Sequence, residues 1–276
     1  MDGSWNLGPV SEQSQNDETE RVSRERRGHV LLIGLNRPKK LNAWDELMVA
    51  QLSEAYTELE DDDELRCAVL FAHGKHFTAG VHLTAFADLW AAGRNPIAPP
   101  EGKIDPLDLF GRTREKPVVA AVHGLCYTIG IELLLATDIR IAASDTRFGQ
   151  VEVLRGIYPV GGATLRFARE VGWGNAMRYL LTGDEFDATE AHRIGFVQEV
   201  VEPGRELERA LAIAQTIADA APLGVRATRV SMKAALDKSF AEALAALLPD
   251  LVPILNSEHA REGVASFIER RKANFN

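Results

Sequence analysis

Three short apolar runs constrain the fold of this chain more than any other feature of its sequence. They occupy residues 29–35, 67–72 and 118–122, and each has about the length of an ordinary β-strand. Because nearly every position in each run is apolar, the pattern predicts strands that are buried on both faces of a sheet. Residues 45–61 lie between the first two runs and repeat their apolar side chains at helical spacing. Strands that alternate with helices predict an α/β domain.

The rest of the chain divides by composition. Residues 1–27 are polar, and their low hydrophobicity predicts a disordered tail. Residues 86–116 contain too many glycines and prolines for one regular element, so we expect an irregular wall or lid there. From residue 206 onward, apolar side chains recur at helical spacing. We therefore expect a tail at 1–27, a core domain at 28–205 and a helical region at 206–276.

Composition argues against several classes of function. The formal net charge is −9 and the sequence pI is about 5.4, so the surface should repel nucleic acid and anionic lipid. The sequence has no apolar run of about 18 residues, the length that a membrane-spanning helix needs. The two cysteines and seven histidines form no metal-ligand spacing, and so few cysteines fit a reducing, cytoplasmic compartment. We expect no metal site, no nucleic-acid partner and no membrane span.

Two glutamates carry the chemistry that the sequence suggests. Glu132 stands in the apolar segment 129–136, where loss of solvation should raise the pKa of its carboxyl group. Taken alone, this segment fits equally well a helix-surface glutamate with a packed stem. Glu152 follows in another apolar context, beyond a predicted strand at 139–143 that can return the chain to the same pocket. Together, two such carboxyl groups can move a proton to one carbon while activating water at the next.

Several motifs, taken in order along the chain, resemble those of one enzyme family. They are NRPKKLNA at 36–43, HFTAGVHL at 76–83, KPVVAAVHG at 116–124, ATDI at 136–139 with Glu132, FGQVE at 148–152, and the terminal segment 261–275. From about residue 28 onward, the chain resembles the crotonases, the enoyl-CoA hydratase/isomerase superfamily. The resemblance implies a ClpP-like spiral of ββα units and a C-terminal helical trimerisation region, assembled as trimers or as hexamers of two trimers. It also implies an acyl-CoA thioester substrate and no cofactor.

For catalysis, the resemblance implies two backbone N–H groups that bind the thioester oxygen as negative charge develops on it. In this chain, the two donors would be Val81 and Ile129. Glu152 would deliver a proton to the α-carbon, and Glu132 would hold and activate the water that attacks the β-carbon, with help from the Val160 amide. Family hydratases have glutamate at both acidic positions, whereas many isomerases keep only the later one. The resemblance therefore favours a hydratase.

The resemblance also implies which residues contact the substrate. The expected set is Lys40, Leu41, Ala79, Val81, His82, Leu83, Thr84, Ile129, Val160, Lys272 and Phe275. Lys40 and Leu41 would lie beside coenzyme A. Lys272 and Phe275 would bring a basic and an aromatic group to its nucleotide, sometimes in a neighbouring subunit. An equally acceptable interpretation of these last two residues is a solvated helix end with one packed ring.

Two departures from the family pattern affect the expected site. A glycine cluster usually precedes the first glutamate, but residues 127–131 read Tyr-Thr-Ile-Gly-Ile. Thr128 and Ile129 lack the freedom of glycine at positive φ, so we expect the acyl fit or the oxyanion geometry to differ from those of a typical hydratase. His82 stands where aspartate is usual, and we expect it to be packed or hydrogen-bonded rather than catalytic.

Three hypotheses remain after this reading. The first is a hydratase that uses both Glu132 and Glu152. The second is another crotonase reaction, such as double-bond isomerisation, in which Glu152 alone moves the proton. The third is a non-catalytic member that binds coenzyme A, RNA or a protein partner. The acidic balance argues against RNA, and retention of both carboxyl groups argues against a dead site. The identity of the acyl group stays open.

Overall fold

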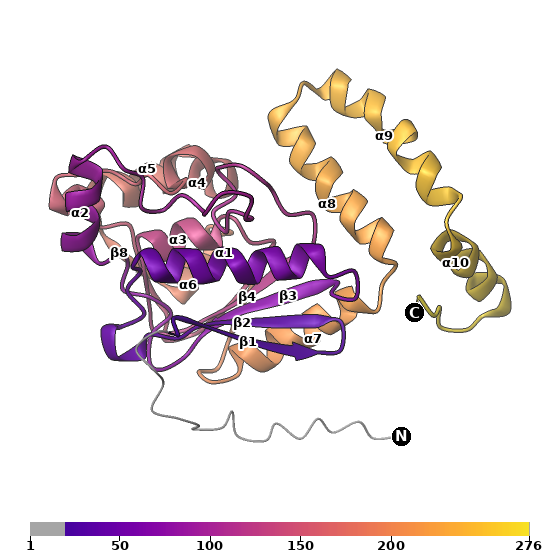
Figure 1. Cartoon of the computed structure of the whole chain (residues 1–276), viewed down its shortest axis with the longest axis horizontal. Coiled ribbons are helices and arrows are strands. Elements are labelled where there is room, and N and C mark those ends of the chain that lie inside the picture. Colours follow the sequence, from indigo (N-terminus) through magenta and orange to yellow (C-terminus); the bar gives the residue numbers. More distant parts are fainter. Residues whose placement is uncertain (1–19, 276) are drawn as a thin grey trace.

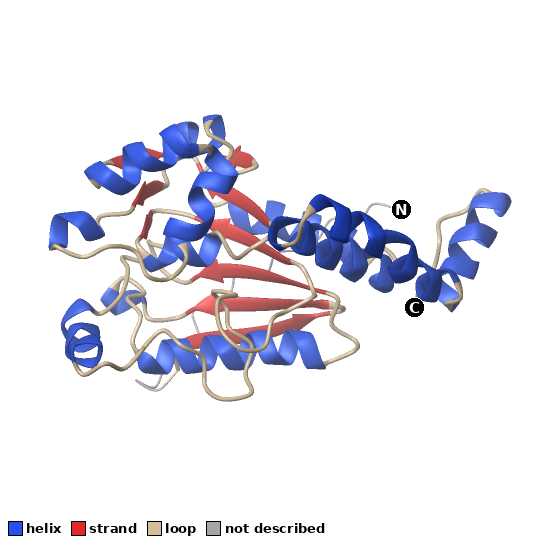
Figure 2. Cartoon of the chain, turned by 90° about the horizontal axis from the view of Figure 1, so that it is seen from above, coloured by secondary structure: helices blue, strands red, loops and turns tan. Residues whose placement is uncertain are grey.

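A six-stranded sheet forms the centre of the computed structural model, which describes residues 20–275 (Figures 1 and 2). The strands lie in the order β1-β2-β3-β4-β6-β9. β1 runs antiparallel to β2, and the other neighbours are parallel. Their bounds are β1 (Val22–Arg27), β2 (Val30–Leu35), β3 (Cys67–Ala72), β4 (Val118–Val122), β6 (Ile139–Ala143) and β9 (Glu199–Val201). The three apolar runs are confirmed as β2, β3 and β4, in which every residue is buried.

Helices cover both faces of this sheet (Figure 1). α1 (Glu46–Asp61) packs on one face, where it shares a core with Ile33 of β2. α7 (Glu206–Ala218) packs on the opposite face, where its buried alanines meet Leu32 of the same strand. Successive side chains of β2 thus enter two different cores, which explains why the strand is apolar at consecutive positions.

A smaller sheet carries the segments that hold both glutamates. Within the described residues it has the strand order β5-β7-β8, with β5 (Leu125–Tyr127) parallel to β7 (Arg147–Gly149) and β7 antiparallel to β8 (Glu185–Asp187). Glu132 follows β5 and Glu152 follows β7 in the chain. The connected helices are α3 (Ile129–Leu134), the 3-10 helix η2 (Glu152–Arg155), α4 (Ala163–Val171), α5 (Trp173–Thr182) and α6 (Ala188–Arg193). The two parallel strands therefore deliver both glutamates to the same end of the small sheet.

The expectation of a disordered tail is wrong for its last residues. Residues 22–27 form β1 and pair along their whole length with β2. Low hydrophobicity does not prevent this, because an edge strand buries only part of its surface. Val22 is buried, whereas Arg24 stays exposed and pairs with Glu58 of α1. The core domain therefore begins at or before residue 22. Residues 1–19 of the expected tail lie outside the described residues.

The C-terminal helices separate into two groups. Because α7 covers the main sheet, the core domain extends to residue 218 and does not end at 205. α8 (Pro222–Asp237), α9 (Phe240–Leu255) and α10 (Glu258–Glu269) project beside the core, and we call them the arm (Figures 1 and 2). Within α8 and α9 no residue is buried. The large apolar side chains exposed on the arm are Leu223, Val230, Met232, Leu236, Phe240, Leu244, Leu247, Leu248, Leu251, Val252, Leu255, Val264, Phe267 and Ile268.

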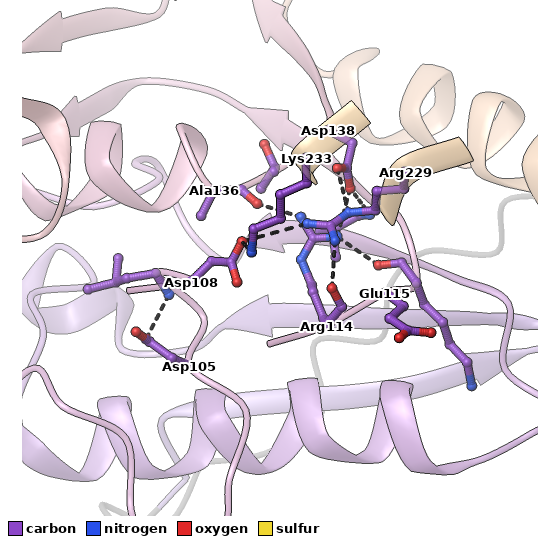
Figure 3. Close-up of polar contacts among 12 residues, drawn as sticks. Asp105, Asp108, Arg114, Glu115, Ala136, Asp138, Arg229 and Lys233 are labelled. Atoms are coloured by element: carbon purple, nitrogen blue, oxygen red, sulfur yellow. Dashed lines mark hydrogen bonds and ion pairs between the residues drawn. The ribbon is translucent and has the colours of Figure 1, made fainter. Parts of the chain in front are cut away.

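Charge pairs hold α8 against the core (Figure 3). Arg229 of α8 pairs with Asp138, which also accepts a hydrogen bond from the buried Arg114. Asp108 pairs with both Arg229 and Lys233. Burial alone would raise the pKa of Asp138, but the guanidinium groups of Arg114 and Arg229 hold it below its usual value. Asp138 therefore joins the arm to the core through its charge.

The segment at residues 86–116 is helical only at its beginning. α2 (Leu83–Ala91) extends into it, and turns and bends make up most of the remainder. The prediction that this segment is not one regular element is confirmed. Trp90 and Ile97 place it along the wall of a cavity that also receives the two glutamates.

Candidate active site

A cavity of about 760 Å³ lies beside the small sheet and is bordered by both glutamates. Its volume is in the ordinary range for a small-molecule site. The predicted site residues that line it are Ala79, Val81, Leu83, Ile129, Glu132, Glu152 and Val160. A larger cavity of about 1240 Å³ lies between α8 and α4, but neither glutamate borders it. We therefore place the candidate site in the smaller cavity, which both buried glutamates line.

Glu132 is buried in α3 and held by the backbone. Glu132 is 2% exposed. Its Oε1 accepts hydrogen bonds from the N–H groups of Gly161 (2.7 Å) and Ala163 (3.1 Å). Burial raises the pKa of Glu132 to about 7, although both hydrogen bonds and the charge of Arg166 act in the opposite direction. This confirms the predicted rise and excludes a helix-surface position for this glutamate.

Glu152 begins η2 and is 8% exposed. Burial raises its pKa to about 7, and the negative charge of Glu132 contributes in the same direction. Its Oε2 is buried and has no hydrogen-bond partner within residues 20–275. The two carboxyl groups are therefore close enough to influence each other, yet only Glu132 is held by the loop at residues 161–163.

The Val81 N–H is turned away from Trp44 by the pairing of its neighbours. Trp44 donates its N–H to the Gly80 carbonyl (2.9 Å), and its own carbonyl accepts from the His82 N–H (2.8 Å). Gly80 and His82 thus pair on the Trp44 side of this extended segment. Because backbone groups alternate sides along an extended chain, the N–H of Val81 points away from Trp44. Val81 itself borders the cavity.

The Ile129 N–H is oriented by Thr128. The Thr128 N–H donates to the Gly149 carbonyl (2.9 Å), and the Thr128 carbonyl accepts from the Glu132 N–H (3.2 Å). The Thr128 carbonyl is therefore turned into the first turn of α3. Because the carbonyl and the next N–H point to opposite sides of a trans peptide, the Ile129 N–H points out of that turn. Ile129 borders the same cavity as Val81.

Thr128 keeps a backbone conformation that is ordinarily left to glycine. Its φ is 50° and its ψ is −113°, although it is β-branched. Such a conformation costs about 1–3 kcal/mol in a residue that has a side chain. Thr128 thus retains a glycine-like backbone without being glycine, and the departure noted in the sequence appears as strain at the residue before Ile129.

The residues expected to contact coenzyme A near this cavity lie in two segments, one with Lys40 and Leu41 and the other with His82 and Thr84. Lys40 ends the short 3-10 helix η1 (Pro38–Lys40), and the Leu41 carbonyl accepts a hydrogen bond from the N–H of Ala79, which lines the cavity. Lys40 and Leu41 are both exposed and adjoin this cavity-lining residue, although neither of them lines the cavity. His82 precedes α2 and makes no side-chain cap, and Thr84 lies exposed in the first turn of that helix.

Lys272 and Phe275 do not reach this cavity within one chain. Lys272 Nζ forms an ion pair with Asp219 at the end of α7 (2.7 Å), and the Phe275 carbonyl accepts a hydrogen bond from Arg66 (2.9 Å). The Phe275 ring packs edge-on against His259. Arg66 precedes β3, whereas the cavity residues 79–83 follow it, so the two groups lie at opposite ends of that strand. Within one chain these two residues form a solvated helix end with one packed ring, and a contact with the nucleotide of a neighbouring subunit stays a prediction.

Some lining residues were not singled out by their sequence. Tyr127 and Glu185 border the cavity, and the Tyr127 hydroxyl donates a hydrogen bond to the Glu185 carboxylate. The two face each other across Gly149 in the small sheet, where the glycine leaves room for the Tyr127 ring. Burial raises the pKa of Tyr127 to about 12, and the bond to Glu185 adds to this rise. The contact of Gly161 and Ala163 with Glu132 likewise had no signal in the sequence beyond a glycine-rich stretch.

Within residues 20–275, no group of three or more His, Cys, Asp or Glu residues could hold a metal ion. In the same part of the chain, no single helix is long and apolar enough to cross a membrane, although α9 and α10, bent by 79°, meet that test as a pair.

Comparison with known proteins gives a consistent picture. The family model "Enoyl-CoA hydratase/isomerase" matches residues 25–276. The chain is 34% identical over 258 residues to the enoyl-CoA hydratase EchA19 of Mycobacterium tuberculosis, covering 91% of this chain and 94% of that protein. It is also 34% identical over 258 residues to the short-chain-enoyl-CoA hydratase of Clostridium acetobutylicum, covering 92% and 97%. A crystal structure of a probable enoyl-CoA hydratase/isomerase from Mycobacterium abscessus aligns with a TM-score of 0.89 at 49% identity, covering 94% of this chain and 99% of that one.

Proposed function

Since the chain belongs to the enoyl-CoA hydratase/isomerase family of enzymes and has the crotonase fold, we propose that it adds water reversibly across the 2,3 double bond of an enoyl-CoA thioester. The observation that carries this proposal is that Glu132 and Glu152 line one cavity together with Val81 and Ile129. The reaction needs an acid, a base and a site for negative charge, and these four residues supply all three.

Negative charge is stabilised by the two amides. When water attacks the β-carbon, electrons move toward the thioester oxygen, which becomes enolate-like. The N–H groups of Val81 and Ile129 donate hydrogen bonds to this oxygen in a site that excludes most water. A preorganised donor of this kind contributes about 3–4 kcal/mol to lowering the barrier. Neither donor depends on its side chain, so valine and isoleucine serve as well as smaller residues.

The two glutamates exchange roles with the direction of the reaction. In hydration, ionised Glu132 removes a proton from water as its oxygen bonds to the β-carbon, and protonated Glu152 delivers a proton to the α-carbon. Because the pKa of each carboxyl group is raised to about 7, the pair can hold a single proton near neutral pH. The N–H groups of Gly161 and Ala163 occupy Oε1 of Glu132, which leaves its Oε2 for the water.

The substrate enters beside the exposed Lys40 and Leu41. We place coenzyme A along this mouth and the acyl group toward Tyr127, Tyr158 and Trp90, which line the same cavity. The reaction requires no cofactor, because the acid, the base and the charge-stabilising donors all belong to the chain. Acyl-CoA thioesters are substrates of lipid metabolism, and the free, buried Cys67 and Cys126 support a cytoplasmic location.

The arm supports assembly into trimers or hexamers of two trimers. Its apolar side chains are exposed over most of α9 and α10, and such a surface marks a protein interface. Light scattering should give the mass of a trimer or hexamer for the unmodified chain. Leu248→Asp in α9 should lower that mass, whereas Leu47→Asp on the exposed side of α1 should not. A monomeric unmodified chain would contradict this part of the proposal.

Activity is tested with a panel of enoyl-CoA thioesters, by following loss of the conjugated-thioester absorbance. Glu132→Gln and Glu152→Gln should each slow hydration by about 10²–10⁴-fold, because each removes one proton-transfer group. Glu185→Gln is the matched control, since it changes a carboxylate on the same cavity that takes no proton in the mechanism. Its hydration rate should stay close to that of the unmodified chain.

Isomerisation is the second candidate, and one contrast between the glutamates favours it. Glu132 Oε1 is held by two amides, whereas Oε2 of Glu152 has no hydrogen-bond partner within residues 20–275. An isomerase that uses Glu152 alone would keep its activity in Glu132→Gln. Double-bond migration in that variant, without hydration of any thioester by the unmodified chain, would reverse the assignment. Binding of thioesters without either reaction would instead identify a non-catalytic member.

A further inference from the structure

The side chain of Thr128 lies between the two segments that present the Val81 and Ile129 amides. Thr128 directly precedes Ile129, and Gly80 directly precedes Val81. A Cβ atom placed on Gly80 would lie 2.4 Å from Thr128 Oγ1 and 3.6 Å from Thr128 Cβ. The threonine side chain therefore fills the space beside the Gly80 backbone. The two donor segments meet through this contact.

The contact is one of packing. Thr128 Oγ1 is buried and has no hydrogen-bond partner within residues 20–275, so no polar bond holds it against Gly80. Gly80 has a φ of +110° and its carbonyl pairs with Trp44, which ties its segment to the core on the other side. Thr128 is tied in turn by its hydrogen bonds to Gly149 and Glu132. The Thr128 side chain thus lies against Gly80 while hydrogen bonds hold the backbones of both segments.

Thr128 also combines two unfavourable features. Its backbone is held at a φ that side chains rarely adopt, and its hydroxyl is buried without a partner. Glycine would remove both. A strained backbone conformation persists only where the surrounding structure enforces it, and such conformations concentrate at functional sites. Here the strained ψ of Thr128 sets the plane of the peptide that carries the Ile129 N–H.

We propose that Thr128 is a positioning residue, whose side chain packs against Gly80 and sets the separation of the Val81 and Ile129 N–H groups. This inference rests on the proposed function, because it concerns the donors that bind the thioester oxygen. Without the side chain, the two segments move closer and the Ile129 peptide gains rotational freedom. The donors then meet the oxygen at poorer distances and angles, although substrate contacts elsewhere are unchanged.

Three substitutions test whether the bulk of the Thr128 side chain or its hydroxyl group sets the separation of the two N–H groups. Thr128→Gly removes the spacer and relieves the backbone, so kcat should fall by about tenfold or more, with little change in KM, while the melting temperature rises by roughly 2–4 °C. Thr128→Val keeps a branched side chain without the hydroxyl, and Thr128→Ser keeps Oγ1. Both should retain kcat within about threefold, because each keeps an atom near the position that touches Gly80.

A spectroscopic measurement reads the donors without turnover. A cinnamoyl-CoA-type thioester is bound to the full-length Glu132→Gln, Glu152→Gln double variant, and the red shift of its absorbance reports polarisation of the thioester carbonyl. Adding Thr128→Gly should reduce this shift, and replacing it with Thr128→Val should restore the shift. An undiminished shift together with an unchanged kcat in Thr128→Gly would overturn the proposal and leave Thr128 as a packing residue.

The same measurement distinguishes failure of the proposed function. If the double variant with Thr128 intact binds the thioester but produces no red shift, the two amides do not bind its oxygen, and both proposals are refuted. If that variant does produce a red shift, the oxyanion site stands, and only the contribution of Thr128 is decided by the substitutions. Thr128→Val keeps this decision open to refutation even where Thr128→Gly fails to fold.

Discussion

Adding one methyl group at Gly161 should disable the site by moving Glu132. The φ of Gly161 lies outside the region that side chains avoid, so alanine meets no backbone strain there. A Cβ atom at this position would lie 2.5 Å from Glu132 Oε2 and 2.9 Å from the Cδ1 of Ile129. Ordinary contact distances are about 1 Å longer, and the carboxylate must therefore retreat by about that amount.

The retreat has a calculable effect on catalysis. It lengthens the hydrogen bonds from the N–H groups of Gly161 and Ala163, which are 2.7 and 3.1 Å long. A reacting group displaced by about 1 Å loses about 10²-fold in rate. Because these two bonds lower the pKa of Glu132, their loss should raise it further above about 7. The acidic limb of the rate profile should then move to higher pH, and overpacking should destabilise the fold by about 1–3 kcal/mol.

The assay is steady-state hydration of an enoyl-CoA thioester across neutral and mildly alkaline pH, together with thermal unfolding. Gly174→Ala is the matched control, because Gly174 lies within α5 and has open space where its Cβ would be. That variant should keep its kcat and gain about 0.5–1 kcal/mol of stability. If Gly161→Ala lowered stability but left kcat and its pH dependence unchanged, the assignment of Glu132 as the base would be refuted.

Three other perturbations follow from buried or shared charges. Burial raises the pKa of Glu132 from about 4.5 to about 7, so between these pH values the native state holds a proton that the unfolded chain has lost. The free energy of unfolding should therefore fall by about 3 kcal/mol as pH rises through this window. Urea unfolding of Glu132→Gln should show less of this loss. Arg140 is buried and pairs with Glu170, and Arg140→Met should reduce the free energy of unfolding by about 3–5 kcal/mol, since it leaves that carboxylate without its partner. Arg229→Met removes the ion pair between α8 and Asp138, so amide hydrogen exchange should become faster in α8 and stay unchanged in α1. An exchange rate in α8 equal to that of the unmodified chain would show that other contacts hold the arm.

The elements that sequence patterns predicted well are those set by local periodicity. β2, β3, β4 and α1 were predicted within a residue or so of their bounds, because each records its own burial in the spacing of its apolar side chains. β1 gave no such signal, since an edge strand is stabilised by backbone pairing with β2 and needs few apolar residues. The apolar face of α7 was visible, but the sheet against which it packs was not.

The same division applies to the site. The sequence by itself determined that Glu132 and Glu152 stand in apolar surroundings, and its motifs determined the family. Only the tertiary structure decided that the amides of Gly161 and Ala163 hold Glu132, that Thr128 presses on Gly80, and that Lys272 lies away from the cavity. The physical reason is that side-chain chemistry and periodicity are properties of neighbouring residues in the sequence. A contact between distant segments forms only when the whole chain has folded.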